Sequence, residues 1–136
     1  MKFSNWQFGE LEYEEHHVLT FPSGIIGFEQ LHTFVLVNYE DTEPFRWLIS
    51  LQDQTVSFPL LEASRVVPDY TLPDDQSREV FFIACLSSTI EESTVNLRSP
   101  ILIDNAVREG KQIIIENELY SMQFPLFPSA PQPVGT

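Results

Sequence analysis

The sequence predicts a single all-β domain with little helix, folded as an antiparallel β-barrel or a tightly curled sheet. Apolar residues recur mostly at every second position, in short runs that turn residues separate and that are rich in Val, Ile and Phe. No stretch of about twelve or more residues holds an apolar face at helical spacing. About eight such runs in one short chain favour a closed or nearly closed sheet, because closure protects strand edges.

The first expected strands lie before an acidic loop. Apolar residues alternate over 3–8 and 11–13, and an acidic pair separates these segments from the run 18–21. The run 34–37 is continuously apolar, and the acidic, Pro-containing stretch 39–44 ends it. Runs of this length between turn-forming residues are typical of strands.

The remaining expected strands follow that loop. Apolar and other residues alternate over 45–51, and the apolar run 56–61 comes next. A long run at 78–86 is followed by the shorter runs 101–103 and 112–116. These segments are dominated by Val, Ile, Leu and Phe, which fit a pleated and at least half-buried surface.

Helical signal is confined to short segments. Residues 28–32 and 104–109 are the best candidates, and the side chain of Asp104 can cap a turn that Gly110 then ends. A further turn is expected at 66–70. None of these segments is long enough to change the fold class.

Length and composition indicate one domain at 1–127 and a tail at 128–136. The chain has 136 residues, of which 43% are hydrophobic and 11 are Phe, which is enough to fill one core. The tail is rich in Pro and lacks apolar periodicity, so we expect it to be disordered. The chain lacks an apolar leader and any run of about twenty apolar residues, so we expect a cytoplasmic protein.

The charge balance bears on the choice of partners. Twenty acidic residues oppose seven basic ones, which gives a net charge of -13. Nucleic acids and anionic membranes bind through Lys and Arg, so neither is expected to bind this chain directly. A basic protein partner would instead be attracted and steered. The alternative is that the charge only keeps the protein soluble.

The sequence contains no recognisable catalytic or metal-binding pattern. Gly24 and Gly27 are not followed by the Lys-Ser/Thr pair of a phosphate-binding loop, so they indicate a turn. His16 and His17 are adjacent, and in a strand they would point to opposite faces and could not easily share a zinc ion, so we expect surface or edge histidines. Cys85 lies in an apolar run and is expected to be buried and inert. We therefore predict no enzyme, no metal site and no cofactor.

Aromatic residues occupy both faces of two expected strands. Phe81 and Phe82 are adjacent, and Phe45 and Trp47 flank an arginine. Burial of both faces, as in a curled barrel, explains this pattern, and the alternative is an exposed aromatic anchor for a partner. A further alternative is a small ligand-binding or enzymatic barrel whose aromatics line a pocket, which a filled core would count against. A structural subunit held by an edge strand is the remaining alternative.

Four segments, in order, resemble the flagellar assembly factor FliW family. They are the Phe-Pro-Ser-Gly-Ile-Ile-Gly-Phe-Glu stretch at 21–29, the tryptophan strand at 44–53, the Thr-Val-Asn-Leu stretch that opens 94–103, and 108–114. The closing segment 120–126 is also similar. The likeness covers the body of the chain.

The sequence departs from the family pattern at a few positions. Ile26 stands where the family usually has proline, and Ile49 and Ser99 replace a common glutamine and alanine. Glu62 and Ala63 stand where an aspartate-proline pair is frequent. These changes affect local geometry and touch no residue to which a chemical role can be assigned.

The resemblance implies a cytoplasmic switch between two partners. Members of the family bind newly made flagellin at its C-terminal region. After flagellin is exported, the free protein binds CsrA, a small basic RNA-binding repressor, and allosterically relieves its block on flagellin translation. The acidic charge of this chain independently suits a basic partner.

Five residues are candidates for partner binding. Phe28 and Glu29 follow the glycine turn and could present an apolar and acidic edge. Asp53 ends the tryptophan strand, where it is either an acidic contact or a turn cap. Asn96 and Leu97 could belong to an exposed edge strand that a flagellin segment extends, although Asn96 could equally make a structural hydrogen bond in a turn.

Overall fold

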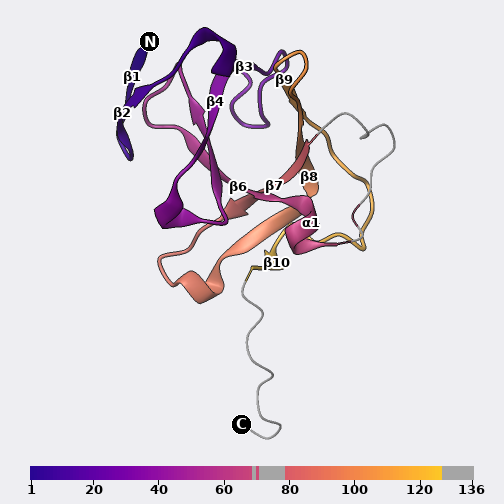
Figure 1. Cartoon of the computed structure of the whole chain (residues 1–136). Coiled ribbons are helices and arrows are strands. Elements are labelled where there is room, and N and C mark those ends of the chain that lie inside the picture. The colour runs from indigo at the N-terminus through magenta and orange to yellow at the C-terminus, as the bar shows by residue number, and fades with distance from the viewer. Residues whose placement is uncertain (69, 71–78, 127–136) are drawn as a thin grey trace, which may run out of the picture.

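The computed structural model describes residues 1–68, 70 and 79–126 (Figure 1). The expected disordered tail, 128–136, lies outside the described residues. The elements in chain order, with η marking a 3-10 helix, are β1 (Lys2–Asn5), β2 (Gly9–Glu12), η1 (Glu15–His17), β3 (Leu19–Thr20), β4 (Thr33–Asn38), η2 (Glu40–Thr42), β5 (Arg46–Ser50), β6 (Ser57–Glu62), α1 (Ala63–Val66), β7 (Glu79–Cys85), η3 (Ile90–Glu92), β8 (Thr94–Asp104), β9 (Glu109–Gln112) and β10 (Phe124–Pro125). No helix in the described part is long and apolar enough to cross a membrane.

Seven strands close into a barrel. The strands β3 to β8 pair in chain order, each antiparallel to the next, and β9 joins β8 to β3 to complete the ring. The pairing of β3 with β9 is parallel, at Thr20 and Glu109. Strand β10 adds to β8 outside the ring, and β1 and β2 form a separate hairpin beside β4 (Figure 1). The prediction of a small all-β barrel domain with minor helix is confirmed.

Strand β8 is the longest strand in the described part, and it bends away from β7 in its middle. Asn96 pairs with Ile83, whereas Ile101 pairs with Phe81. The segment 97–100 on β8 therefore opposes a single residue on β7, which is a β-bulge. Beyond the bulge β8 pairs with β9, and before it with β10.

The interior of the barrel is filled with apolar side chains. They come from alternate positions of the strands, because successive side chains of a strand point to opposite faces. Phe21 and Phe34 meet edge to face with ring centroids 5.2 Å apart. The buried members of this cluster are Leu19, Phe21, Ile25, Leu31, Phe34, Leu48, Leu60, Phe81, Ile101 and Ile103. A filled interior is the result that counts against a ligand-binding barrel.

The strands are also covered on their outer faces. Phe82, the neighbour of the inward-facing Phe81, packs outside the barrel against Tyr70, with ring centroids 4.7 Å apart. Trp47 is buried with Leu11 of the N-terminal hairpin. The Phe81 and Phe82 rings of β7 are therefore buried on opposite faces, as expected, whereas Phe45 and Trp47 both pack outside the barrel and the inner face of β5 is buried through Leu48.

Several local elements differ from the sequence expectations. Residues 28–32 form turns, and 104–109 forms the turn of the β8–β9 hairpin and opens β9. Strand β9 ends at Gln112, where the strand 112–116 was expected to begin. The reason is that pairing with β8 places the strand earlier in the chain and outweighs the local apolar pattern. The helix α1 precedes the turn expected at 66–70.

The opposite-face arrangement considered for the two histidines and the burial expected for Cys85 are both wrong. His16 and His17 lie in η1, not in a strand, and their rings lie close together with centroids 4.1 Å apart. The cause is the capping of η1, in which the Glu14 amide donates to Nδ1 of His17 at 3.0 Å. Cys85 is exposed, because it is the last residue of β7 and its neighbours give it no cover.

Candidate functional site

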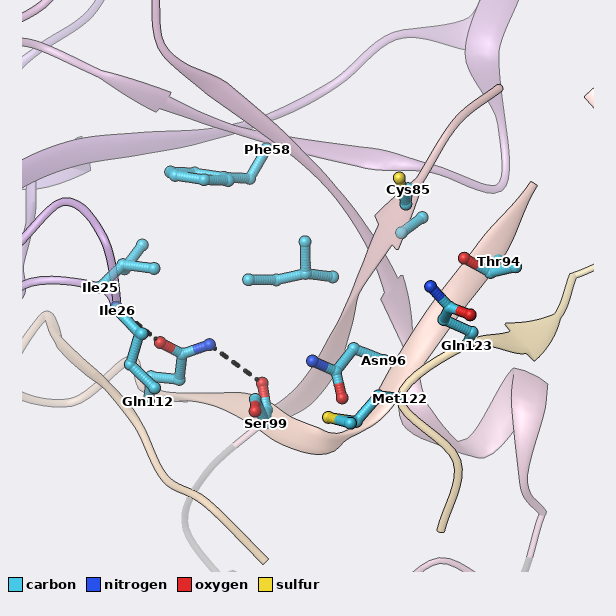
Figure 2. Close-up of a pocket in the computed structure, with 12 residues that line it drawn as sticks. Ile25, Ile26, Phe58, Cys85, Thr94, Asn96, Ser99, Gln112, Met122 and Gln123 are labelled. Atoms are coloured by element: carbon cyan, nitrogen blue, oxygen red, sulfur yellow. Dashed lines mark hydrogen bonds between the residues drawn. The ribbon is translucent and has the colours of Figure 1, made fainter. Parts of the chain in front are cut away.

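A pocket lies beside the β8 bulge on the inward-facing side of β7 and β8, because Ile25 belongs to the interior cluster and Phe58 and Ile83 pack against it (Figure 2). We call it the bulge pocket, and its volume is about 370 Å³. It lies between the turn that follows β3, the strands β6 to β9, and the segment before β10. Its lining residues are Ile25, Ile26, Phe58, Ile83, Ala84, Cys85, Thr94, Asn96, Ser99, Gln112, Met122 and Gln123.

One side chain ties the two walls of the bulge pocket together. The Gln112 carbonyl oxygen accepts from the Ile26 amide at 2.8 Å, and the Gln112 amide group donates to the Ser99 carbonyl oxygen at 3.3 Å (Figure 2). Gln112 ends β9 and Ser99 lies in the β8 bulge. The loop before Ile26 is therefore fixed to the bulge, although the Ile26 side chain itself is 55% exposed.

The lining of the bulge pocket is uncharged. The residues that form it are apolar or carry amides, hydroxyls or sulfur. Asn96 is held in place because its side-chain oxygen accepts from the Arg98 amide at 2.9 Å, so the structural role considered for Asn96 is confirmed. Such a lining can bind apolar groups and make hydrogen bonds, but it has no acid-base pair with which to move a proton.

The Phe28 side chain lies next to the bulge pocket. Its ring packs edge to face against Phe58, a lining residue, with centroids 5.2 Å apart. The turn that carries Phe28 is tight, because a methyl group on Gly24 would come within 2.6 Å of the Glu29 Cα. Gly24 has a φ of 68°, a conformation that glycine adopts without strain. The Phe28 side chain is thus half-buried and belongs partly to the core.

Glu29 and Asp53 lie on neighbouring turns. Gln52, which precedes Asp53, accepts from the Thr33 amide at 2.9 Å and donates to the Gln30 carbonyl oxygen at 3.4 Å. This links the β5–β6 turn to the turn that carries Glu29, which is exposed. The structure therefore brings Phe28, Glu29 and Asp53 to one side of the barrel.

Asp53 is a turn cap. Its carboxylate accepts from the Thr55 hydroxyl at 2.6 Å and from the Thr55 amide at 2.9 Å. These two bonds, the hydroxyl first, hold the pKa of Asp53 below its usual value. The turn-cap interpretation is confirmed, and the exposed carboxylate also keeps its charge at neutral pH.

Leu97 does not join the other candidates. It is 3% exposed and packs outside the barrel, on the side away from the bulge pocket. The expectation that Asn96 and Leu97 lie on an exposed edge strand is wrong. The reason is that β8 pairs with β7 and β10 at this point, and the Leu97 amide donates to the Ser121 carbonyl oxygen at 2.9 Å.

Most of the described basic side chains form ion pairs or hydrogen bonds within the protein. Lys2 lies 3.5 Å from Glu10, and Arg46 lies 2.9 Å from Glu62. Arg98 donates to the Tyr120 carbonyl oxygen and Arg108 to that of His17. Many carboxylates are exposed and have no basic partner among the described residues, including those of Glu40, Asp41, Glu43, Glu91, Glu92, Glu116 and Glu118. The exposed charge on the described surface is therefore mostly negative, as the composition indicates.

Sequence reasoning missed Gln112 and Phe58 as site residues. Neither carries a recognisable signal, since the pairing of Gln112 with Ile26 spans most of the chain. Within the described ranges, no group of three or more His, Cys, Asp or Glu side chains could hold a metal ion. The arrangement has the chemistry of a binding surface.

The chain is similar to known proteins along most of its length. The profile of the family described as FliW protein matches residues 2–126. The chain is 32% identical to the flagellar assembly factor FliW of Caldanaerobacter subterraneus subsp. tengcongensis, with 93% of each chain covered. It is 35% identical to the one from Thermosipho africanus, over 93% of this chain and 95% of that protein.

The fold is similar to a solved structure as well. A crystal structure of the flagellar assembly factor FliW superposes with a TM-score of 0.84 at 30% identity, covering 94% of this chain and 98% of the other. The match extends over the barrel and the elements around it. The chain belongs to the FliW family of flagellar assembly factors.

Proposed function

We propose that this protein is a non-enzymatic cytoplasmic regulator that couples flagellin translation to flagellin export. In this proposal it binds the C-terminal region of newly made flagellin, and when free it binds CsrA and antagonises that repressor allosterically. It has no direct contact with nucleic acid or membrane. The observation that carries the proposal is the excess of exposed carboxylates on a FliW barrel whose described cations are mostly engaged internally. Such a surface attracts a small basic protein and repels RNA.

Flagellin and CsrA are proposed to compete for overlapping surface. The turn region of Phe28, Glu29 and Asp53 supplies an apolar and acidic edge, and Asn96 contributes through the neighbouring bulge pocket. Leu97 would act only indirectly, by supporting β8 from its buried side. Competition makes the outcome depend on the concentration and affinity of each partner.

Calorimetric titration of the protein with CsrA from the same organism tests the proposal. The titration is repeated with flagellin present and at two salt concentrations. We expect binding that weakens with salt, because exposed charges are screened, and that disappears when flagellin is added. Folded protein that binds neither partner at micromolar concentration would contradict the proposal.

A matched pair of variants tests the proposed surface. Glu29→Lys and Glu118→Lys make the same change in net charge at two exposed positions. We expect only Glu29→Lys to weaken partner binding, by roughly three- to tenfold, since like charges at an interface are unfavourable. Equal effects of the two substitutions would assign the acidic contribution to net charge alone.

A further inference from the structure

A second hollow, larger than the bulge pocket, lies near the end of the described chain. Its volume is about 480 Å³, and we call it the C-terminal groove. It runs between the start of β5, the helix α1 and the strand β10. Figure 1 shows α1 and β10 close together below the labelled ends of β6 and β7. Its lining residues are Pro44, Phe45, Leu61, Arg65, Val66, Phe124, Pro125 and Leu126.

The C-terminal groove is apolar because short elements leave the outer core partly uncovered. Phe45, Val66 and Leu126 pack against the buried cluster outside the barrel, and each is only half-buried. The helix α1 has four residues and β10 has two, too few to close over that cluster. Phe124 stands at the rim with 38% of its surface exposed. An apolar hollow of this kind, open to solvent, is typical of a docking site.

Two acidic turns adjoin segments that line the C-terminal groove. The helix η2 carries Glu40 and Asp41 and leads directly into the lining residue Phe45, whose amide donates to the Thr42 carbonyl oxygen. The helix η3 carries Glu91 and Glu92 and is joined to β10, because the carbonyl oxygen of Ser93 accepts from the Leu126 amide. These carboxylates are exposed.

Positive charge at the C-terminal groove is scarce. Among the described residues that line it, Arg65 is the one cation. Arg46, which follows Phe45, is paired with Glu62 at 2.9 Å and lies 3.9 Å from Glu79. The lining of the groove is therefore apolar apart from Arg65, and the charged side chains of the two adjoining turns η2 and η3 are acidic.

We infer that the C-terminal groove docks a short segment of a partner protein in which apolar side chains are flanked by lysine or arginine. The apolar side chains would enter beside Phe45, Val66 and Phe124, and the cations would meet the carboxylates of η2 and η3. Peptide segments are commonly recognised through a few apolar anchors with charged flanks that set specificity. The inference rests on the proposed function for the existence of a basic partner and adds a second contact surface for that partner, beside the turn region of Phe28, Glu29 and Asp53.

The first test removes the apolar contact. Phe124→Ser is compared with Val107→Ser, which truncates another exposed apolar side chain, on the turn between β8 and β9. Binding of CsrA is measured by calorimetry on the full chain. We expect Phe124→Ser to lower the affinity at least about tenfold, as loss of an aromatic anchor does, and Val107→Ser to change it less than about twofold.

The second test reverses charge at the rim. The double variant Glu91→Lys/Glu92→Lys is compared with Glu10→Lys/Glu12→Lys, which makes the same change in net charge on the N-terminal hairpin, distant from β10 (Figure 1). We expect the η3 variant to weaken CsrA binding by roughly tenfold and to flatten its salt dependence, and the hairpin variant to have a much smaller effect.

The outcomes separate this inference from the proposed function. If CsrA binds the unaltered protein and both groove variants equally well, the C-terminal groove is not its docking site, and the proposed function stands. If CsrA does not bind the unaltered protein at all, both fail. Self-association of the unaltered protein that Phe124→Ser abolishes, seen by sedimentation, would assign the groove to a second copy and overturn the inference. Circular dichroism and urea unfolding establish that each variant is folded.

Discussion

The ring of Phe21 lies directly against the backbone of Gly110. A methyl group on the Gly110 Cα would come within 2.6 Å of Phe21 Cε1, and the Phe21 ring is fully buried. Gly110 pairs with Ile103 of β8, and one residue before Phe21 the Thr20 amide donates to the Arg108 carbonyl oxygen at 3.0 Å. The contact therefore sits at the seam where β9 closes the barrel between β3 and β8.

Gly110→Ala is expected to destabilise the protein. The added methyl group must displace the Phe21 ring, and overpacking of a core costs about 1–3 kcal/mol. Urea unfolding followed by circular dichroism measures the change in the free energy of unfolding. An unchanged midpoint would show that the seam can open at little cost.

The double variant Phe21→Leu/Gly110→Ala provides the control. Phe21→Leu alone leaves a cavity and destabilises the barrel, but in the double variant the methyl group introduced by Gly110→Ala would fill part of that space. We therefore expect the double variant to lose less free energy of unfolding than the sum of the losses in the two single variants. Strict additivity would show that Gly110→Ala acts through some other contact than the Phe21 ring.

Gln112→Ala is expected to free the turn at Ile26. The substitution removes the bond to the Ile26 amide and the bond to the Ser99 carbonyl oxygen. Hydrogen exchange at the Ile26 amide should accelerate by roughly tenfold, because the amide loses its partner. The measurement is amide exchange by nuclear magnetic resonance.

Gln112→Glu separates the two hydrogen bonds. A carboxylate still accepts from the Ile26 amide, but it cannot donate to the Ser99 carbonyl oxygen. Protection of the Ile26 amide should therefore survive in this variant. Loss of protection in both variants would mean that the bond to Ser99 is what holds the side chain in place.

The fold class was predictable because its signals are local. The alternation of apolar residues along the chain and the lack of a helical face both reflect how single strands bury one or two faces. The burial of Phe81 and Phe82 on opposite faces of β7 followed from the same argument. Strand boundaries were less predictable where pairing with a distant strand decides them, as it does for β9.

The candidate site was only partly predictable. The turns that carry Glu29 and Asp53 are linked by the hydrogen bonds of Gln52, and no sequence pattern predicts this contact. Leu97 was misplaced because the bulge and the partners of β8 cannot be read from its apolar residues. The exposed Cys85 likewise depends on where β7 ends in space, although its own run is apolar.

The stability of the protein is expected to fall between pH 10 and 12 through Tyr70. Burial, with a smaller effect of the neighbouring Tyr120, raises the pKa of Tyr70 to about 12. An unfolded tyrosine releases its proton near pH 10, so between these values unfolding is favoured as the pH rises, and above about pH 12 the effect stops growing. Thermal unfolding across this range should show a steeper decline for the unaltered protein than for Tyr70→Phe.

The Tyr70 hydroxyl itself can be observed directly. Burial raises the pKa of Tyr39 as well as that of Tyr70, so absorbance of the phenolate as the folded protein is titrated should show late ionisation of both, and the step near pH 12 should vanish in Tyr70→Phe. That variant also loses the weak bond from the Tyr70 hydroxyl to the Leu97 carbonyl oxygen at 3.4 Å, so a small loss of stability at neutral pH is expected. A step near pH 12 that persists would have to belong to another tyrosine.

Asp53 can be tested for its two roles separately. Asp53→Ala removes both bonds to Thr55, so its melting temperature at neutral pH should be lower than that of the unaltered protein. Because the pKa of Asp53 is held below its usual value, the contribution of the carboxylate is present above about pH 4 and lost as the pH falls further, so the two melting temperatures should converge in acid.

Asp53→Asn keeps an oxygen that accepts from Thr55 and removes the charge. If the charge contacts CsrA, Asp53→Asn should melt close to the unaltered protein and bind CsrA less tightly. Unchanged CsrA binding by Asp53→Asn would show that Asp53 acts only as a turn cap and that its charge does not contact CsrA.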